Sequence, residues 1–205
     1  PGRVPFARAP GETIAVFAGA FRRWHGAVTL VEAVRRLRLR GLRSIGAVLI
    51  GDGPELARAR RAADGLDGIR FTGALAHADM PAALAAADVG VAPFDVAAHP
   101  PLSLGFYWSP LKMFEYMASG LPVVAPAIEG LSRIVTDGRE GLLYNPCDAG
   151  GLASALERLI DPDRRRALGA AARARVVQEF SWARHCERLA AAMQAALERR
   201  DRQGR

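Results

Sequence analysis

A lysine and a glutamate lie three residues apart in the stretch "SPLKMFEYMASGLPVV" of residues 109–124, and Lys112 is the only lysine in the chain. Ser109 is placed to cap a helix and Pro110 to be its first residue, so the free N–H groups of that turn predict an anion site. The ammonium of Lys112 would strengthen a phosphate site there, and the carboxylate of Glu115 could accept hydrogen bonds from a ribose diol. A weak surface ion pair between Lys112 and Glu115 is the alternative, and spacing alone does not separate the two.

A second candidate phosphate-binding segment is "FAGAFRRWHG", residues 17–26. Arg22 and His25 could meet a diphosphate, and Gly19 would allow close approach of the backbone. The segment "GDGPEL" is an incomplete dinucleotide fingerprint with leucine at the third glycine position, so it is weak evidence for NAD. Histidines and cysteines show no metal-ligand spacing, and we expect neither a metal nor a cofactor.

Short apolar runs alternate with amphipathic segments along most of the chain. The runs are continuously apolar, which is typical of parallel strands covered on both faces. Ligands of such sheets bind at the carboxyl ends of the strands, where both candidate segments and the long loop 94–109 lie. The sequence therefore predicts an α/β fold, a Rossmann-like parallel sheet covered by helices on both faces, with a helical C-terminal appendage. The predicted strands are 13–20, 45–53, 69–73, 88–94, 121–127 and 140–145.

Composition indicates the limits of the domains, and net charge indicates the class of partner. Residues 1–12 have the Pro, Gly and Arg content of a linker, here from a missing N-terminal domain. We expect the ligand-binding domain in 13–180, a helix packing back on the fold in 181–200 and a frayed tail in 201–205. The net charge of +7 favours anionic partners. The sequence has no basic patch interleaved with aromatic residues, so we do not expect nucleic acid to be the partner.

The cellular setting is read from two further features. No run of about 18 apolar residues is present, so no membrane span is expected. Two widely separated cysteines are typical of a reduced, cytoplasmic protein. A peripheral contact between the Arg-rich tail and a membrane surface is a compatible addition.

The segments "LIGDGPE", "IRFTGAL", "SPLKMFEYMASGLPVVAP" and "EFSWARHCERL" occur in the order and spacing of a known family. They resemble the C-terminal, donor-binding domain of the group-one retaining glycosyltransferases with the two-domain B-type fold. The resemblance covers Ile14 to Leu189. It implies metal-independent transfer of a glycosyl group from a nucleoside-diphosphate sugar to a glycan, lipid-linked or small-molecule acceptor held by an N-terminal domain that is absent here. The alternatives are a non-catalytic nucleotide-sugar-binding module or partner subunit and, fitting the 109–124 stretch less well, a nucleotide-sugar epimerase.

The resemblance also implies roles for single residues. Glu115 is similar to the second glutamate of the family's pair, which binds the ribose hydroxyls, and Gly19 to the glycine of the first phosphate loop. Lys112 and the backbone of 109–111 would lie near the diphosphate, and residues 71–75 would flank the base. The candidate catalytic residues are Lys112, Arg22 and His25, and the candidate donor-binding residues are Gly19, Phe71, Leu75, Tyr107, Ser109, Pro110, Leu111 and Glu115.

Four positions depart from the family pattern. Tyr107 stands where the first glutamate of the pair is usual, and Ala20 and His25 stand where the first loop usually has basic residues. Arg133 replaces a later glutamate. Aromatic-rich members with "WHG" and "SPLK" are similar, so we interpret the changes as the character of a subgroup.

Overall fold

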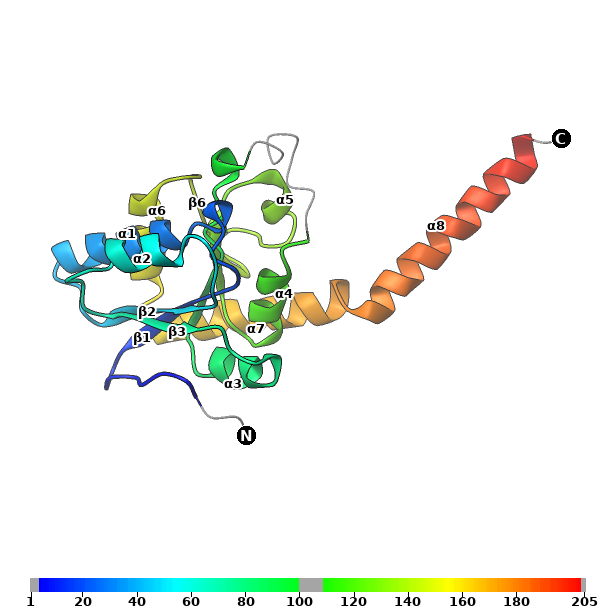
Figure 1. Cartoon of the computed structure of the whole chain (residues 1–205). Coiled ribbons are helices and arrows are strands. Elements are labelled where there is room, and N and C mark those ends of the chain that lie inside the picture. The colour runs from blue at the N-terminus through cyan, green and yellow to red at the C-terminus, as the bar shows by residue number, and fades with distance from the viewer. Residues whose placement is uncertain (1–3, 100–108, 204–205) are drawn as a thin grey trace.

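The computed structural model describes residues 4–99 and 109–203, which form a six-stranded sheet flanked by helices (Figure 1). All the strand pairs are parallel, and the order is β3-β2-β1-β4-β5-β6. The strand order reverses between β1 and β4, as in doubly wound nucleotide-binding folds. The predicted Rossmann-like parallel sheet is confirmed. The strands are β1 Thr13–Ala18, β2 Ile45–Ile50, β3 Ile69–Gly73, β4 Val89–Val91, β5 Val123–Pro126 and β6 Gly141–Tyr144.

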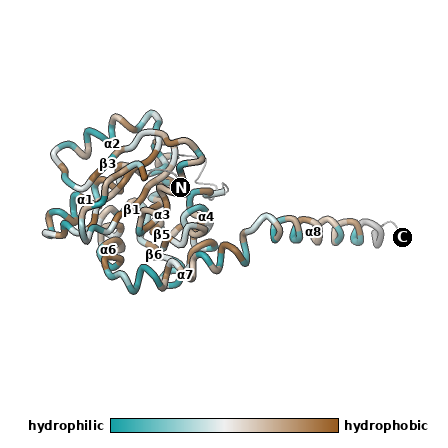
Figure 2. Tube along the Cα trace, turned by 90° about the horizontal axis from the view of Figure 1, so that it is seen from below, coloured by the Kyte–Doolittle hydropathy of each residue, from teal (hydrophilic) through white to brown (hydrophobic). Residues whose placement is uncertain are grey.

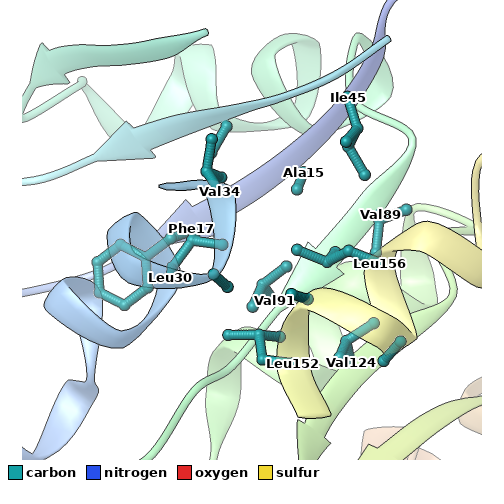
Figure 3. Packing of buried hydrophobic residues seen from close by; sticks show 14 of the residues in the cluster. Ala15, Phe17, Leu30, Val34, Ile45, Val89, Val91, Val124, Leu152 and Leu156 are labelled. Carbon is teal, nitrogen blue, oxygen red and sulfur yellow. The ribbon is translucent and has the colours of Figure 1, made fainter. Parts of the chain in front are cut away.

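Helices cover both faces of this sheet, which is why its central strands are apolar throughout. One face packs on α1 (Ala27–Leu39), α2 (Leu56–Ala62) and α6 (Ala149–Arg158). Figure 3 shows part of this layer, with Leu30, Val34, Leu152 and Leu156 meeting Phe17 and Val91 of the sheet. The other face packs on α3 (Met80–Ala85), α4 (Leu111–Ala118), α5 (Glu129–Ser132) and α7 (Pro162–Glu179). In the described part of the chain, three short turns of 3-10 helix lie in the loops: η1 Arg23–His25, η2 His77–Asp79 and η3 Val96–Ala98.

The strands β1 and β4 separate early. They pair only at Ala15 with Val89 and at Val16 with Gly90. Beyond these pairs the end of β1 has no strand partner on that side, and a crevice opens at the carboxyl edge of the sheet. This is the place where the reversal of strand order predicts a ligand.

The start of α4 differs from the expected one. The helix begins at Leu111, and Pro110 occupies the N-cap position with φ −81° and ψ 69°. The N–H of Leu111 donates to the carbonyl of Ser109 at 3.0 Å. Ser109 therefore forms no side-chain cap, and Pro110 is not a helical residue; both assignments were wrong by one position, because the proline backbone here is outside the helical region.

Both ends of the described chain also differ from expectation. Arg8 pairs with Asp88 at 2.8 Å and Arg70 with Glu12 at 2.8 Å, so the expected linker contacts the body. Helix α8 (Trp182–Gln203) extends away from the body in both views (Figures 1 and 2). Trp182 is 80% exposed, so the expected packing of this helix onto the fold is not found. Only the start of α8, at Trp182 and His185, borders the body, where these residues line a hollow with Phe114 and Phe180. Within the described residues no helix is long and apolar enough to cross a membrane.

A buried carboxylate ties α7 to the segment before β6. Glu140 is fully buried and accepts hydrogen bonds from Arg175 at 3.0 Å and from the N–H of Thr136 at 2.8 Å. Arg139 approaches its other oxygen at 3.2 Å from the solvent side. Arg175 also donates to the carbonyl of Arg133 at 3.0 Å.

We expect Arg175→Ala to lower the free energy of unfolding by about 3 kcal/mol, because it leaves a buried charge without its main partner. Urea unfolding measures this effect. Arg133→Ala is the control: it removes an exposed pair with Glu129, which should contribute less than about 1 kcal/mol. Equal losses in the two variants would contradict this interpretation of Arg175.

Candidate functional site

A cavity of about 540 Å³ lies at the carboxyl ends of β1, β2 and β3, beside the start of α4. It sits at the crevice where the strand order reverses. A hollow of about 580 Å³ next to residues 4–7 offers no basic side chain among its described lining residues. The cavity at the crevice is therefore the better candidate for an anionic ligand. The predicted site residues that line it are Gly19, His25, Leu75, Ser109, Leu111, Lys112 and Glu115.

The central feature of the cavity is the ammonium of Lys112. Only 9% of the residue is exposed, and its Nζ has no hydrogen-bond partner among the described residues. Nζ lies 4.4 Å from the ring centroid of Phe17 and 5.0 Å from that of Phe94. Burial lowers the pKa of Lys112 to about 7, and Glu115 opposes this shift. An anion in the cavity would give this cation the partner it lacks.

Glu115 does not serve as that partner. It is exposed, and the described residues contain no ion pair between it and Lys112. The surface-pair alternative is thus not the arrangement found. Glu115 lines the cavity one helical turn beyond Lys112. Its carboxylate remains available to a ligand.

Gly19 lets the first loop approach the lysine. A Cβ at this position would lie 3.0 Å from Nζ of Lys112. The backbone has φ +144°, a conformation that side chains rarely adopt. The expected role of Gly19 in close approach is therefore compatible with the geometry.

His25 faces the cavity but brings no charge at neutral pH. Its Nδ1 is hydrogen-bonded to the carbonyl of Ala20, so that nitrogen carries the proton. Burial, followed by the charges of Lys112 and Arg22, lowers the pKa of His25 to about 4 against the effect of this hydrogen bond. With Nδ1 donating to Ala20, the free Nε2 of the neutral imidazole can only accept a hydrogen bond. The predicted role of His25 at a diphosphate stays a prediction.

Three predicted residues lie elsewhere. Arg22 is exposed, stands 6.0 Å from the ring of Trp24 and lines a neighbouring hollow of about 320 Å³. The turn η1 places His25 inward and leaves Arg22 outside. Phe71 packs 6.3 Å from Phe21 and does not line the cavity. Pro110 is buried at the N-cap. Tyr107 lies outside the described residues.

Sequence reasoning missed the aromatic groups that fix Lys112. The rings of Phe17 and Phe94 flank its ammonium, and Tyr116 lies one helical turn after it. The hydroxyl of Tyr116 accepts a hydrogen bond from the N–H of Ala18 at 2.8 Å. The spacing of Lys112 and Tyr116 on one helix was the signal available in the sequence.

The described residues contain no group of three or more His, Cys, Asp or Glu side chains that could hold a metal ion.

A family model and a curated relative both match this chain. The family model described as glycosyl transferases group 1 matches residues 12–162. The chain is 33% identical over 163 residues to a GDP-mannose-dependent alpha-(1-6)-phosphatidylinositol monomannoside mannosyltransferase of Mycobacterium tuberculosis, covering 77% of this chain and 41% of that protein. The chain thus spans less than half the length of this curated relative.

Solved structures share the fold. The Anabaena protein HepE in complex with UDP and glucose superposes with a TM-score of 0.75 at 21% identity, over 90% of this chain and 49% of that one. The C-terminal domain of the group 1 family protein LpcC from Francisella tularensis superposes with a TM-score of 0.68 at 23% identity, over 83% of this chain and 87% of that domain.

Proposed function

Because the chain belongs to the group 1 glycosyl transferases, we propose that its cavity binds the nucleoside diphosphate of a nucleotide-sugar donor and that the chain is the donor-binding half of a retaining glycosyltransferase. The observation that carries the proposal is the buried ammonium of Lys112, which points at a cavity without a protein partner. A buried, unpaired cation is costly, so its retention is best explained by a ligand of opposite charge.

In this proposal each cavity residue has one role. The diphosphate lies between Lys112 and the backbone of Gly19, close to the first turn of α4. Glu115 accepts hydrogen bonds from the ribose hydroxyls, and Leu75 flanks the base. His25 lines the same cavity, and its free Nε2 can accept a hydrogen bond from the bound donor.

The reaction is departure of the nucleoside diphosphate from the anomeric carbon of the sugar. Negative charge grows on the leaving phosphate, and the Lys112 ammonium and the positive end of α4 stabilise it. These groups are fixed before the ligand arrives, so they need no rearrangement as the charge develops. A metal ion is not required for this role.

We expect Glu115→Ala to weaken binding of UDP, GDP or ADP by about tenfold or more, since a carboxylate accepting hydrogen bonds contributes roughly 1.5–3 kcal/mol. Calorimetry with each nucleotide, with and without its sugar, measures the loss and identifies the base. Glu129→Ala is the control, because Glu129 is exposed, pairs with Arg133 and does not line the cavity. A nucleotide that lacks both ribose hydroxyls should be insensitive to Glu115→Ala. Unchanged affinity for the intact nucleotide would disprove this role of Glu115.

A non-catalytic nucleotide-sugar-binding module is the second candidate. The neutral His25 and its neighbour Ala20 favour it, because neither supplies a positive charge to a leaving diphosphate at neutral pH. Glycosyl transfer by the full gene product separates the candidates: Lys112→Ala should slow transfer more than it weakens nucleoside binding in an enzyme. The Mycobacterium tuberculosis relative is named for a phosphatidylinositol-linked acceptor, which makes a lipid-linked acceptor the first to try.

A further inference from the structure

At the end of β1, the side chain of Tyr116 makes the backbone hydrogen bond that a neighbouring strand would otherwise make. The β1–β4 ladder stops at Val16, so the N–H of Ala18 and the carbonyl of Val91 have no partner across the crevice. The hydroxyl of Tyr116 meets both groups: it accepts a hydrogen bond from the N–H of Ala18 at 2.8 Å and donates a long, weak one to the carbonyl of Val91 at 3.5 Å. Tyr116 is fully buried. Its oxygen therefore replaces one rung of the sheet and keeps the two strands apart.

The opposite strand is shaped to receive this ring. A Cβ at Gly90 would lie 2.4 Å from the ring of Tyr116. Any larger residue at position 90 would push the tyrosine, and with it α4, away from the crevice. The seam is thus a fitted contact between Gly90, Tyr116 and Ala18.

This seam is adjacent to the lysine of the candidate site. Lys112 lies one turn before Tyr116 on α4, and the two neighbours of Ala18 are Phe17 and Gly19. Phe17 provides the ring below the ammonium at 4.4 Å, and Gly19 leaves the space next to it. A bond that fixes Ala18 to α4 therefore fixes both neighbours of the ammonium relative to the helix that carries it.

We propose that Tyr116 is a positioning residue of the candidate site: its hydroxyl joins the ends of β1 and β4 to α4 and so holds the Lys112 ammonium, dry and unpartnered, at the mouth of the crevice. The part of the proposal that concerns the placement of Lys112 does not depend on any ligand. Its consequence, that Tyr116 sets the affinity for a diphosphate, rests on the proposed function.

Tyr116→Phe tests the proposal because it removes one oxygen and leaves the ring. The N–H of Ala18 and the carbonyl of Val91 would then be buried without a partner, which favours entry of water or a shift of β1. Either change hydrates Lys112. Since burial is the main cause that lowers its pKa to about 7, the pKa should rise toward its ordinary value. The charged or titratable groups that act on Lys112 are Glu115 on its own helix and His25 on the first loop, and neither is altered.

The measurement is made without ligand. Isotope-labelled lysine gives one signal, because Lys112 is the only lysine of the chain. We expect its titration midpoint to rise by about one pH unit or more in Tyr116→Phe. Tyr144→Phe, a change at the buried tyrosine of the edge strand β6, should leave the midpoint unchanged even if stability falls. A folded Tyr116→Phe variant with an unchanged midpoint would overturn the proposal.

A second measurement keeps the test open if Tyr116→Phe does not fold. In the unmodified chain the amide of Ala18 should exchange with solvent as slowly as that of Val16 in the middle of β1. Fast exchange at Ala18 would also overturn the proposal. Failure of the proposed function is a separate result: the chain would bind no nucleoside diphosphate while both of these measurements came out as expected.

Discussion

Replacing Lys112 by methionine is expected to weaken the binding of nucleoside diphosphates strongly and to stabilise the free chain at neutral pH. Charge-assisted hydrogen bonds to a buried ammonium contribute about 1.5–3 kcal/mol each, so affinity should fall by roughly tenfold to a hundredfold or more. Stability should rise because methionine fills the same space between Phe17 and Phe94 without a buried charge. Lys112 would then favour ligand binding while it lowers the stability of the free chain.

The pH dependence of stability separates this explanation from simple packing. The pKa of Lys112 is about 7 in the folded chain and 10.5 ordinarily. Between these values the unfolded chain binds more protons than the folded one, so stability contributed at this site rises with pH by up to about 1.4 kcal/mol per pH unit. The advantage of Lys112→Met should be largest below pH 7 and shrink as the pH increases. Urea unfolding at several pH values measures it.

The control for Lys112→Met is Arg22→Met. Arg22 is exposed and outside the cavity, so its replacement should alter neither the pH profile nor diphosphate affinity appreciably. Parallel stability profiles for Lys112→Met and the unmodified chain would show that Lys112 is not held in the dry, unpartnered state described here.

Gly51→Ala is expected to cost about 3 kcal/mol or more of stability and to disrupt the cavity. A Cβ at Gly51 would lie 2.0 Å from the carbonyl oxygen of Gly19, which is backbone and cannot rotate away. The backbone at Gly51 also has φ +129°, so alanine is strained there as well. Relief requires the first loop to move, and that loop carries Gly19 and His25.

Gly73→Ala is the matched control for Gly51→Ala. Gly73 ends the neighbouring strand β3 with φ +75°, and a Cβ there meets nothing within 4 Å. It should cost only the left-handed backbone penalty of about 1–2 kcal/mol. Thermal unfolding compares the two, and calorimetry compares nucleotide binding. Similar losses would mean that the contact between β2 and the first loop is not as tight as the structure indicates.

The sheet was predictable because each strand carries its own signal. Runs such as "IGAVLI" and "LPVVAP" are apolar without interruption. This pattern is typical of buried parallel strands, and it can be recognised from the local sequence alone. The extent of β4 was less predictable. Residues 89–94 are apolar throughout, yet only Val89–Val91 pair as a strand, because the Tyr116 hydroxyl and the crevice replace the rest of the ladder.

The sequence was sufficient to predict which helix and which loop form the site. Lys112, Glu115 and Gly19 do line a common cavity, since strand order brings their segments to one edge. The direction of single side chains was not predictable. Arg22 and His25 are three residues apart, and only the turn η1 decides which of them faces the cavity. The neutral state of His25 depends on burial and on Lys112, a residue far away in sequence.

The most direct test of the account is the signal of the single lysine on addition of UDP, GDP or ADP to the isotope-labelled chain. A diphosphate bound at Lys112 must favour the charged form of its ammonium. We expect one of the three nucleotides to shift the lysine signal and to move its titration midpoint well above about 7, the pKa of Lys112 in the free chain. Nucleotide binding detected by calorimetry without any change in the lysine signal would contradict the claim that Lys112 holds the diphosphate.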